Sequence, residues 1–313
     1  MPVAGDITMP PDQFDVIVVG GSYAGLSAAL GLARSRKRVL VIDAGQRRNR
    51  FVPTAHNLLG QDGRAPEAII RDARAEVAAY PTTSFIDGVA VAATPDDAGF
   101  TVTLEDGSTQ HAARLVLATG VADMLPDLPG LRQGWGKWVF HCPYCHGYEV
   151  AEQQLGVLAF GESALHLAKL IPDWGPTTFL TNGTVDLAAS ERAALAARGV
   201  VVEDRGVSAV INGDEGPTGV RLDDGHVLAL DALFIAVPTR QTSPLAAQLG
   251  CAIDDTPQGP TVRVDMMGRT TVPGVYAAGD AAQLDKSLAA AIASGRMVGA
   301  AAAIHPSLMP PAH

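Results

Sequence analysis

Near its start, this 313-residue chain reads Asp15-Val16-Ile17-Val18-Val19-Gly20-Gly21-Ser22-Tyr23-Ala24-Gly25, a pattern that indicates its fold class. Its first five residues are rich in β-branched side chains, which is typical of a buried parallel strand. Residues 24–35 are rich in Ala and Leu and predict a helix, and residues 38–42 predict a second strand. A strand, a glycine turn, a helix and a second strand in this order make a βαβ unit.

The glycine turn follows the G-x-G-x-x-G pattern of dinucleotide-binding proteins, except that Ser22 takes the place of the second glycine. Asp43 ends the second strand, near the spacing expected for an acid that binds a ribose hydroxyl. Glycines let the backbone approach a pyrophosphate, and the helix N-terminus supplies unpaired N–H groups and partial positive charge. A glycine turn alone also fits a plain structural turn. Its place between strand and helix, with the acid present, favours dinucleotide binding.

A similar pattern recurs later in the chain. Residues 155–160, 163–170 and 177–180 predict a second strand–helix–strand unit. Each unit is followed by a hairpin pattern around an Asp-Gly turn, over 100–120 and 219–237. The recurrence predicts a duplicated domain. We therefore expect an α/β fold with two Rossmann-like domains, ending in a strand over 274–280 and an Ala-rich helix from about Ser287 to Ile304.

Composition excludes several classes of function. Hydrophobic residues make up 47% of the chain and charged residues 18%, which is ample material for buried cores. The formal net charge is −10 and the basic cluster at 47–50 is short, so we expect no nucleic-acid partner. We find no signal-peptide pattern at the start, and every apolar stretch is interrupted before it could span a bilayer. We expect a cytoplasmic protein with no membrane partner.

The segment His141-Cys142-Pro143-Tyr144-Cys145-His146 holds two of the three cysteines. Cys-x-x-Cys-His matches the c-type haem attachment pattern, but that function requires export and a small cytochrome domain. Zinc is a second alternative, although no second Cys/His cluster completes a tetrahedral site and Cys251 is solitary. A third is a pair of inert buried thiols. A redox dithiol is favoured, because two intervening residues allow a small disulfide ring and a nearby histidine can move the thiol proton.

Three segments together resemble those of the two-dinucleotide flavoprotein superfamily: Val18–Gly21, Ala118–Gly120 and Tyr276–Asp280. Within it, the mid-chain cysteine pair is similar to that of the low-molecular-weight thioredoxin reductases. The resemblance covers residues 14–303 and implies an FAD-binding domain with a second, pyridine-nucleotide-type domain inserted in it. The implied boundaries are a flexible start over 1–13, the FAD-binding domain over 14–123 and 241–305, the inserted domain with the cysteine pair over 124–240, and a tail over 306–313.

The same resemblance implies which residues hold FAD. Asp43 would bind the adenosine ribose, Asp280 the ribityl–pyrophosphate region and Asn57 would lie closest to the flavin ring, while Val89 would lie beside the adenine. The full implied set is Gly20, Ser22, Tyr23, Ala24, Gly25, Asp43, Arg48, Asn49, Asn57, Val89, Ala118, Thr119, Gly120, Gly279 and Asp280.

By this resemblance, Cys145 would face the flavin and Cys142 would exchange with the substrate. His146 stands where thioredoxin reductases usually carry an acid, and we assign it as the general acid/base. We expect His141 to be structural. The resemblance also implies a homodimer.

The second glycine turn departs from the reductase pattern. Ala159 and Phe160 replace the first residues of the turn, and residues 181–186, after the next strand, contain no arginine. A 2′-phosphate without a cationic partner loses a charge-assisted contact. Leu288-Ala289-Ala290 also stands where the family carries Arg-Gln-Ala. NADPH is therefore not expected to feed the flavin.

Without NADPH, electrons are expected to run from substrate to flavin. Cys142–Glu149 resembles a branch of the family, the FAD-dependent dithiol oxidases that close disulfides in natural products such as gliotoxin, holomycin and romidepsin. This resemblance implies a small-molecule dithiol substrate and oxygen as acceptor. The alternatives are an NADPH-dependent disulfide reductase, a ferredoxin-fed reductase, and a non-catalytic FAD-binding module whose cysteines sense redox state.

Overall fold

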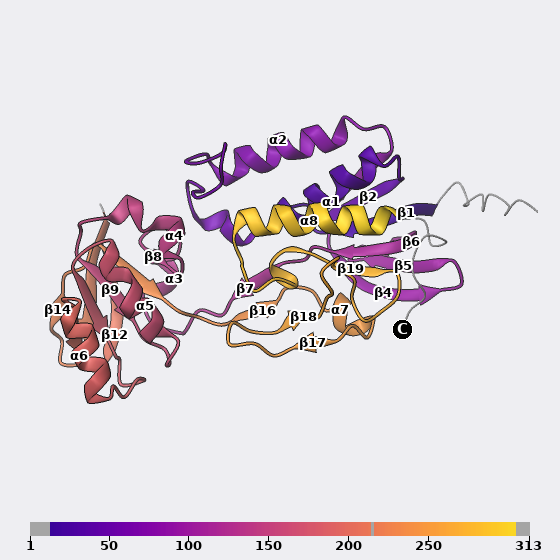
Figure 1. Cartoon of the computed structure of the whole chain (residues 1–313). Coiled ribbons are helices and arrows are strands. Elements are labelled where there is room, and N and C mark those ends of the chain that lie inside the picture. The colour runs from indigo at the N-terminus through magenta and orange to yellow at the C-terminus, as the bar shows by residue number, and fades with distance from the viewer. Residues whose placement is uncertain (1–12, 214–215, 305–313) are drawn as a thin grey trace, which may run out of the picture. The chain divides into compact units, whose positions relative to one another are not determined.

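The computed structural model describes residues 13–213 and 216–304. The tail expected over 306–313, and all of the expected flexible start except Gln13, lie outside the described residues. The chain divides into two compact units (Figure 1). The first contains the described residues up to Arg47, Glu67–Ala122 and the described residues from Arg240, and the second contains Arg48–Pro66 and Asp123–Thr239.

The first unit is built on a seven-stranded sheet of order β3-β2-β1-β6-β5-β4, with β19 paired to β6. The pairings among β1, β2, β3, β6 and β19 are parallel, whereas β4 and β5 add an antiparallel hairpin. The strands are β1 (Gln13–Val19), β2 (Val39–Asp43), β3 (Thr83–Asp87), β4 (Ala90–Asp96), β5 (Gly99–Leu104), β6 (Thr109–Leu117) and β19 (Val275–Ala277); a further pair is β17 (Ile253–Asp254) with β18 (Thr261–Val262). The helices are α1 (Tyr23–Arg34), α2 (Pro66–Ala78), α7 (Leu245–Gln248), η4 (Gly279–Ala281) and α8 (Leu288–Ala303).

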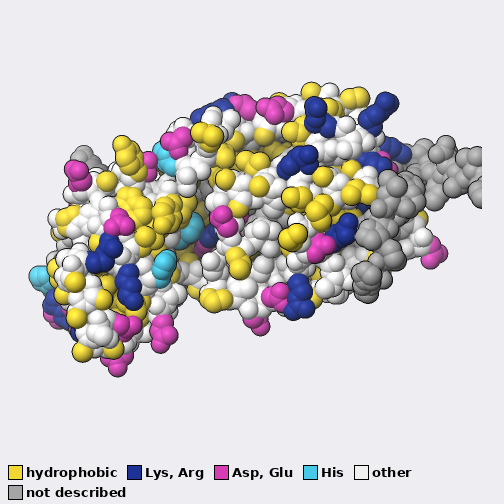
Figure 2. Space-filling model, viewed as in Figure 1, with side chains coloured by type: hydrophobic (Ala, Val, Ile, Leu, Met, Phe, Trp, Pro, Cys, Tyr) yellow, Lys and Arg dark blue, Asp and Glu magenta, His cyan; other side chains and the backbone are white. Residues whose placement is uncertain are grey.

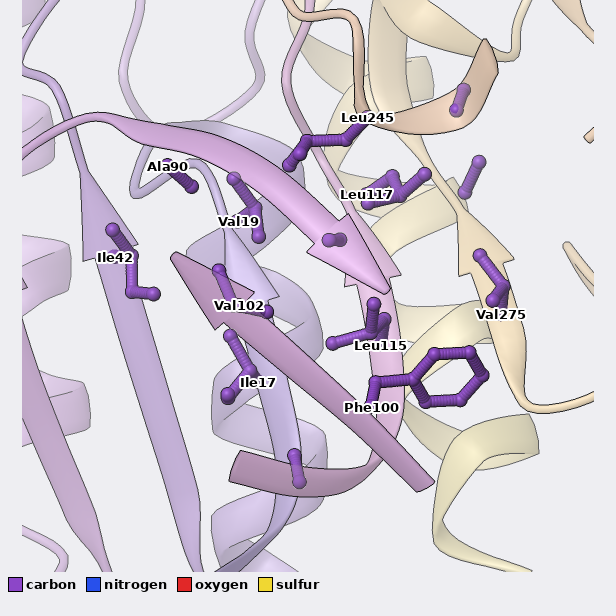
Figure 3. Close-up of a cluster of buried hydrophobic side chains, with 14 of the residues drawn as sticks. Ile17, Val19, Ile42, Ala90, Phe100, Val102, Leu115, Leu117, Leu245 and Val275 are labelled. Carbon is purple, nitrogen blue, oxygen red and sulfur yellow. The ribbon is translucent and has the colours of Figure 1, made fainter. Parts of the chain in front are cut away.

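The core of this unit lies on one face of the sheet (Figure 3). Ile17, Val102, Leu117 and Val275, from four different strands, are almost completely buried there. Leu245 of α7 covers them. Because successive strand residues point to opposite faces of the sheet, the alternate residues of these strands face the other side, where they can pack against helices.

Helices α1 and α8 lie side by side in Figure 1. Their contact requires residues without side chains: a Cβ added at Gly295 would lie 2.1 Å from the Ala24 carbonyl oxygen. A Cβ at Gly299 would lie 2.5 Å from the Ala28 carbonyl oxygen. The Ser27 hydroxyl also donates a hydrogen bond of 2.8 Å to the Ile292 carbonyl, 265 residues away. The last helix is thus held against the helix of the first βαβ unit.

The second unit has a five-stranded parallel sheet of order β11-β10-β9-β15-β8 and an antiparallel sheet β12-β13-β14. Its strands are β8 (Val139–Phe140), β9 (Leu155–Leu158), β10 (Thr177–Leu180), β11 (Val201–Glu203), β12 (Val207–Gly213), β13 (Gly216–Leu222), β14 (Val227–Leu228) and β15 (Ala232–Ile235). Its helices are η1 (Arg48–Phe51), α3 (Leu131–Gly134), α4 (Pro143–His146), η2 (Tyr148–Val150), α5 (Ala164–Leu170), η3 (Ile171–Asp173) and α6 (Ala189–Ala197).

The two units share one topology, which confirms the predicted α/β fold with two Rossmann-like domains. The order β3-β2-β1-β6 in the first sheet is matched by β11-β10-β9-β15 in the second. A fifth parallel strand pairs with the fourth in each sheet, but it comes from different places in the chain: β19, which pairs with β6, follows the other strands of its sheet, whereas β8, which pairs with β15, precedes them. The second domain is inserted in the first, since the chain crosses between units within the paired strands β7 (Val121–Asp123) and β16 (Thr239–Gln241).

The second hairpin differs from the sequence expectation. In the first unit one strand, β6, both closes the hairpin and joins the parallel sheet. In the second unit the hairpin around the Asp224-Gly225 turn is β13–β14, and β15 is a separate strand. Residues 229–231 separate them, and Leu230 there is buried among the side chains between the two sheets.

Segment 48–66 also differs from the implied boundaries, which placed it in the FAD-binding domain. In the structure it contacts the second unit: Arg48 pairs with Asp123, and Phe51 lies against Gly136. The implied boundary came from the family resemblance, whereas these contacts join residues far apart in sequence.

No helix in the described part of the chain is both long and apolar enough to cross a bilayer. On the face seen in Figure 2, acidic and basic side chains are interspersed.

The α1–α8 contact gives the first prediction. Gly295→Ala should force the helices apart and lower the free energy of unfolding by about 1–3 kcal/mol, the usual effect of overpacking. Gly31→Ala is the matched control, because its Cβ would meet its nearest neighbour at 3.8 Å, an ordinary contact. That variant should raise the free energy of unfolding by about 0.5–1 kcal/mol through helix propensity. Urea unfolding measures both, and equal effects of the two variants would contradict the packing argument.

Candidate active site

Cys142 and Cys145 form a disulfide at the start of α4, with Cα atoms 5.3 Å apart. The buried strand β8 leads into it, and Pro143 occupies the first helical position, where proline favours helix initiation. The Cys145 N–H donates to the Cys142 carbonyl at 3.3 Å. Short local contacts therefore hold the two sulfurs together.

Two exposed tyrosines lie close to the disulfide in sequence, Tyr144 between the cysteines and Tyr148 three residues after Cys145. Tyr144 is 63% exposed and Tyr148 is 84% exposed. The Tyr144 ring meets Trp174 edge-on, with centroids 5.6 Å apart. In Figure 2, hydrophobic side chains gather over the part of this unit that α4 and α5 occupy in Figure 1. Cys142 and Cys145 are themselves partly exposed.

His146 ends α4 and follows Cys145 directly. Its ring stacks on Phe140, with centroids 4.6 Å apart. Burial lowers the pKa of His146; Glu149 opposes this effect, and His56 adds to it. The imidazole is therefore neutral at neutral pH and able to accept a thiol proton.

His141 belongs to a separate polar cluster. Its ring stacks on Trp135, with centroids 5.8 Å apart. Burial, reinforced by the Arg48 guanidinium, lowers the pKa of His141 to about 3, although Asp123 acts in the opposite direction. Arg48 holds Asp123 through two hydrogen bonds of 3.1 and 2.5 Å, and this pairing keeps the pKa of Asp123 below its usual value despite burial. These contacts agree with a structural role for His141.

The first unit brings together most of the residues predicted to hold the cofactor. Gly20 has φ +109°, and a Cβ there would lie 2.2 Å from the Ala118 carbonyl oxygen. A Cβ at Gly25 would lie 1.7 Å from the Gly20 carbonyl oxygen. Ser22 is the N-cap of α1 but makes no side-chain capping bond, and Tyr23 and Ala24 are buried in its first turn. The first-turn N–H groups lack partners within the helix and suit an anion.

Asp43 ends β2 beside this turn. A Cβ on Gly21 would lie 2.7–2.9 Å from the Asp43 side-chain atoms, so the absence of a side chain at Gly21 lets the carboxylate lie against the turn. One Asp43 oxygen accepts the Gly45 N–H at 3.2 Å. A carboxylate at this place is the group that binds ribose hydroxyls in dinucleotide-binding folds.

The remaining predicted residues of this unit border the same strand ends. Thr119 and Gly120 follow β6, and their carbonyls accept the Thr242 hydroxyl at 2.6 and 3.2 Å. Gly279 has φ +69°, its N–H donates to the Ser294 hydroxyl at 3.0 Å, and Asp280 follows it in η4. A Cβ at Gly279 would lie 2.8 Å from the Ala24 side chain. Val89 is apart from this group in the loop before β4, with 41% of its surface exposed.

Three predicted cofactor residues belong to the second unit. Arg48 and Asn49 lie in η1, where Arg48 is bound to Asp123. Asn57 has φ +60°, and its N–H donates to Asp62 at 2.7 Å. The individual cofactor contacts of all these residues stay predictions.

The strand ends of the second unit are already occupied by protein groups. The Asn182 amide donates to the Ala159 carbonyl at 3.3 Å and accepts the Val207 N–H at 2.8 Å. Arg192 is bound to Asp204 through bonds of 2.9 and 3.0 Å.

Arg205 is bound to Glu203 and Asp224, and this pairing lowers the pKa of Glu203 to about 2. Both arginines close to these strand ends are therefore neutralised by acids.

Sequence reasoning missed two residues near the disulfide, His56 and Glu149. His56 Nδ1 lies 3.4 Å from Glu149 Oε1, and its ring is 6.5 Å from that of His146. Glu149 was visible in the quoted cysteine segment, but no local pattern connects it with a histidine 93 positions earlier in a different loop.

The first unit is Rossmann-like, and one of its strands ends in an aspartate. The second unit carries a Cys-x-x-Cys disulfide beside a neutral histidine. Together these features define a flavin-dependent thiol–disulfide oxidoreductase. The chain belongs to the pyridine nucleotide-disulphide oxidoreductase family, whose sequence pattern matches residues 14–297. FAD is its cofactor, and the glycine cradle, the N-terminus of α1 and Asp43 fit that group.

Relatives cover almost the whole chain. The protein is 33% identical to thioredoxin reductase tcpT of Claviceps purpurea, over 91% of this chain and 92% of that one. It is 31% identical to thioredoxin reductase sirT of Leptosphaeria maculans, over 92% and 93%.

Solved structures give the same picture. An oxidoreductase from Agrobacterium tumefaciens is 47% identical, with a TM-score of 0.89 over 93% of this chain and 97% of that one. HlmI is 35% identical, with a TM-score of 0.87 over 94% and 92%. These likenesses confirm the predicted resemblance to thioredoxin reductases.

The lowered pKa of His141 predicts how stability depends on pH. Between pH 6.5 and about 3 the unfolded chain binds a proton at this histidine that the folded chain does not, so the free energy of unfolding should fall as the pH falls. His141→Phe keeps a ring on Trp135 and removes the titration, so its stability should fall less from pH 6.5 to 4.5.

The matched control is His111→Phe, which replaces an exposed histidine of β6 and should keep the wild-type pH dependence. Urea unfolding at several pH values measures all three proteins. Equal slopes for wild type and His141→Phe would contradict the assignment of a buried neutral ring.

Proposed function

We propose that this protein is an FAD-dependent dithiol oxidase that closes a disulfide in a small-molecule dithiol and passes the electrons to oxygen, which becomes hydrogen peroxide. The observation that carries the proposal is that side chains at the carboxyl ends of the strands in the second unit are bonded to one another. A nicotinamide nucleotide would bind at these strand ends, and the 2′-phosphate of NADPH would need a free cation there. Instead, Asn182 bridges two strands, and Arg192 and Arg205 are bound to acids.

The relatives' names leave the direction of electron flow open. Thioredoxin reductase is the printed name of tcpT and sirT, and a reductase needs a source of electrons for its flavin. The strand ends described above support the opposite direction, from a dithiol substrate through the cysteines to FAD.

Thiol–disulfide exchange begins at Cys142. A substrate thiolate attacks the Cys142 sulfur, a substrate–Cys142 disulfide forms, and the Cys142–Cys145 bond breaks with Cys145 leaving as a thiolate. His146, adjacent to Cys145, holds or protonates this thiolate. The second substrate thiol then loses its proton to His146 and attacks the substrate sulfur of the mixed disulfide. The substrate leaves as a disulfide, oxidised by two electrons, and the enzyme keeps a dithiol.

When bound, FAD would accept the electron pair of this dithiol, and oxygen would be the final acceptor. The enzyme cysteines return to the disulfide, and the sum is one dithiol and one oxygen converted to one disulfide and one hydrogen peroxide. Asp43 and the first turn of α1 would hold the ribose and the pyrophosphate of the cofactor.

The deciding experiment supplies a small dithiol such as dithiothreitol, in air and without nicotinamide. The amount of oxygen consumed should equal the amount of peroxide formed, and Cys142→Ser or Cys145→Ser should abolish both. Cys251→Ser is the control, since Cys251 lies elsewhere, is buried, and bonds Thr270 through a 3.5 Å contact that a hydroxyl can keep. Turnover that survives in Cys142→Ser would instead favour a sensing module.

A second measurement addresses the NADPH-dependent reductase. NADPH added without oxygen should leave the flavin absorbance unchanged over the time in which dithiothreitol bleaches it. Rapid bleaching by NADPH, with no peroxide from dithiols, would overturn the oxidase proposal. Bleaching by reduced ferredoxin alone would point to the third alternative.

We further propose that the enzyme is a cytoplasmic homodimer. The use of its cysteines as a reactive pair suits a reducing compartment. Light scattering of the purified protein gives the mass, and a monomer would contradict the dimer.

A further inference from the structure

A cluster of titratable side chains beside His146 has no part in the mechanism above. The His56 ring stands edge-on to the His146 ring, with centroids 6.5 Å apart and planes at 86°. His56 Nδ1 lies 3.4 Å from Glu149 Oε1 and 3.6 Å from Asp62 Oδ2. His56 Nε2 lies 3.0 Å from the Thr54 hydroxyl. Both ring nitrogens of His56 are thus held by named groups.

Exposure increases along this cluster within the second unit. The His56 side chain is 16% exposed, that of Glu149 38% and that of Asp62 67%. One face of His146 is covered by Phe140. His56 therefore lies beside the half-buried His146 on one side and near the more exposed carboxylates of Glu149 and Asp62 on the other.

The chemistry needs a connection between His146 and solvent. Oxidation of one dithiol to a disulfide releases two protons, and His146 must lose each proton before it can accept another. A half-buried imidazole exchanges protons through hydrogen-bonding neighbours or water.

We propose that His56, held by Glu149, is a positioning residue that orients His146 and passes its protons to solvent. The inference rests on the proposed function through the role of His146 in thiol–disulfide exchange. It does not depend on which partner supplies or removes the electrons.

Charges around His146 give the proposal a signature. The charged and titratable groups that act on this ring are Glu149 and His56, and His141 lies on the preceding segment. Glu149 raises the pKa of His146, whereas His56 lowers it. Removing Glu149 should therefore shift the pH profile of the exchange step in one direction, and removing His56 should shift it in the other. A mere loss of packing would not produce opposite shifts.

The test follows reduction of bound FAD by dithiothreitol, without oxygen, by stopped flow between pH 5 and 9. The rate should rise with pH as His146 becomes neutral. Glu149→Gln should move the midpoint to lower pH, and His56→Gln should move it to higher pH. The maximal rate of His56→Gln should fall on the order of tenfold, less than the roughly 100-fold or greater loss expected for His146→Gln. The titration of dithiothreitol itself is common to all variants and cancels in the comparison.

Two further variants complete the test. His56→Ala should recover rate when imidazole is added, since free imidazole can replace the missing ring. His111→Gln, an exposed histidine in the first unit, should match wild type. FAD content and circular dichroism check that each variant is folded. Glu149→Gln changes a more exposed side chain and keeps the proposal testable if the His56 variants do not fold.

Midpoints that stay unchanged in both variants, or shift in the same direction, would overturn the role of His56. So would a His56→Gln enzyme with the wild-type rate. Failure of the proposed function would give a different result. A wild-type enzyme that exchanges thiols with dithiothreitol but makes no peroxide in air would contradict the oxidase proposal. Opposite midpoint shifts in the two variants would still support the role of His56.

Discussion

The turn between β1 and α1 depends on a close approach of two backbone segments. The Gly20 carbonyl oxygen occupies the place where a Cβ of Gly25 would lie, and Gly20 itself lies against the Ala118 carbonyl. Any side chain at either position would move α1 away from the sheet. Because α8 then packs on α1 through Gly295, the same constraint carries through to the C-terminal helix. The cradle for the cofactor and the closure of the first unit thus share one set of contacts.

The two units show how one topology can serve two purposes. In the first, the strand ends meet a glycine turn, an uncapped helix and a carboxylate, which together suit a dinucleotide. In the second, the equivalent strand ends are bridged by Asn182 and surrounded by paired acids and arginines. The second unit instead contributes β8, which places Cys142 at the start of α4. Its sheet serves as a rigid support for a redox pair.

Local patterns made the first βαβ unit, the duplicated fold and the cysteine pair predictable. Each depends on neighbours within a few positions: the hydrophobic run before Gly20, or the two residues between Cys142 and Cys145. The acid at Asp43 was predictable for the same reason, since the length of a helix and a strand fixes its place.

Contacts between distant segments could not be predicted. Nothing near Arg48 in the sequence indicates that it pairs with Asp123, 75 positions later, or that segment 48–66 joins the second unit. The separation of β14 from β15 follows from burial of Leu230, which only the packed structure reveals. The resemblance predicted the correct cofactor, FAD, but it gave no information about these contacts, and the residues predicted to hold FAD stay predictions.

Asn182 has a consequence for the engineering of this protein. Its amide closes the gap between the end of β9 and the start of β12, so it works as part of the scaffold. Arginines added at these strand ends would leave this amide in place. Replacing Asn182 by an apolar residue would delete its hydrogen bonds with the Val207 N–H and the Ala159 carbonyl. A variant designed to take a nicotinamide nucleotide at these strand ends would therefore have to replace both hydrogen bonds of Asn182 as well as supply a cation.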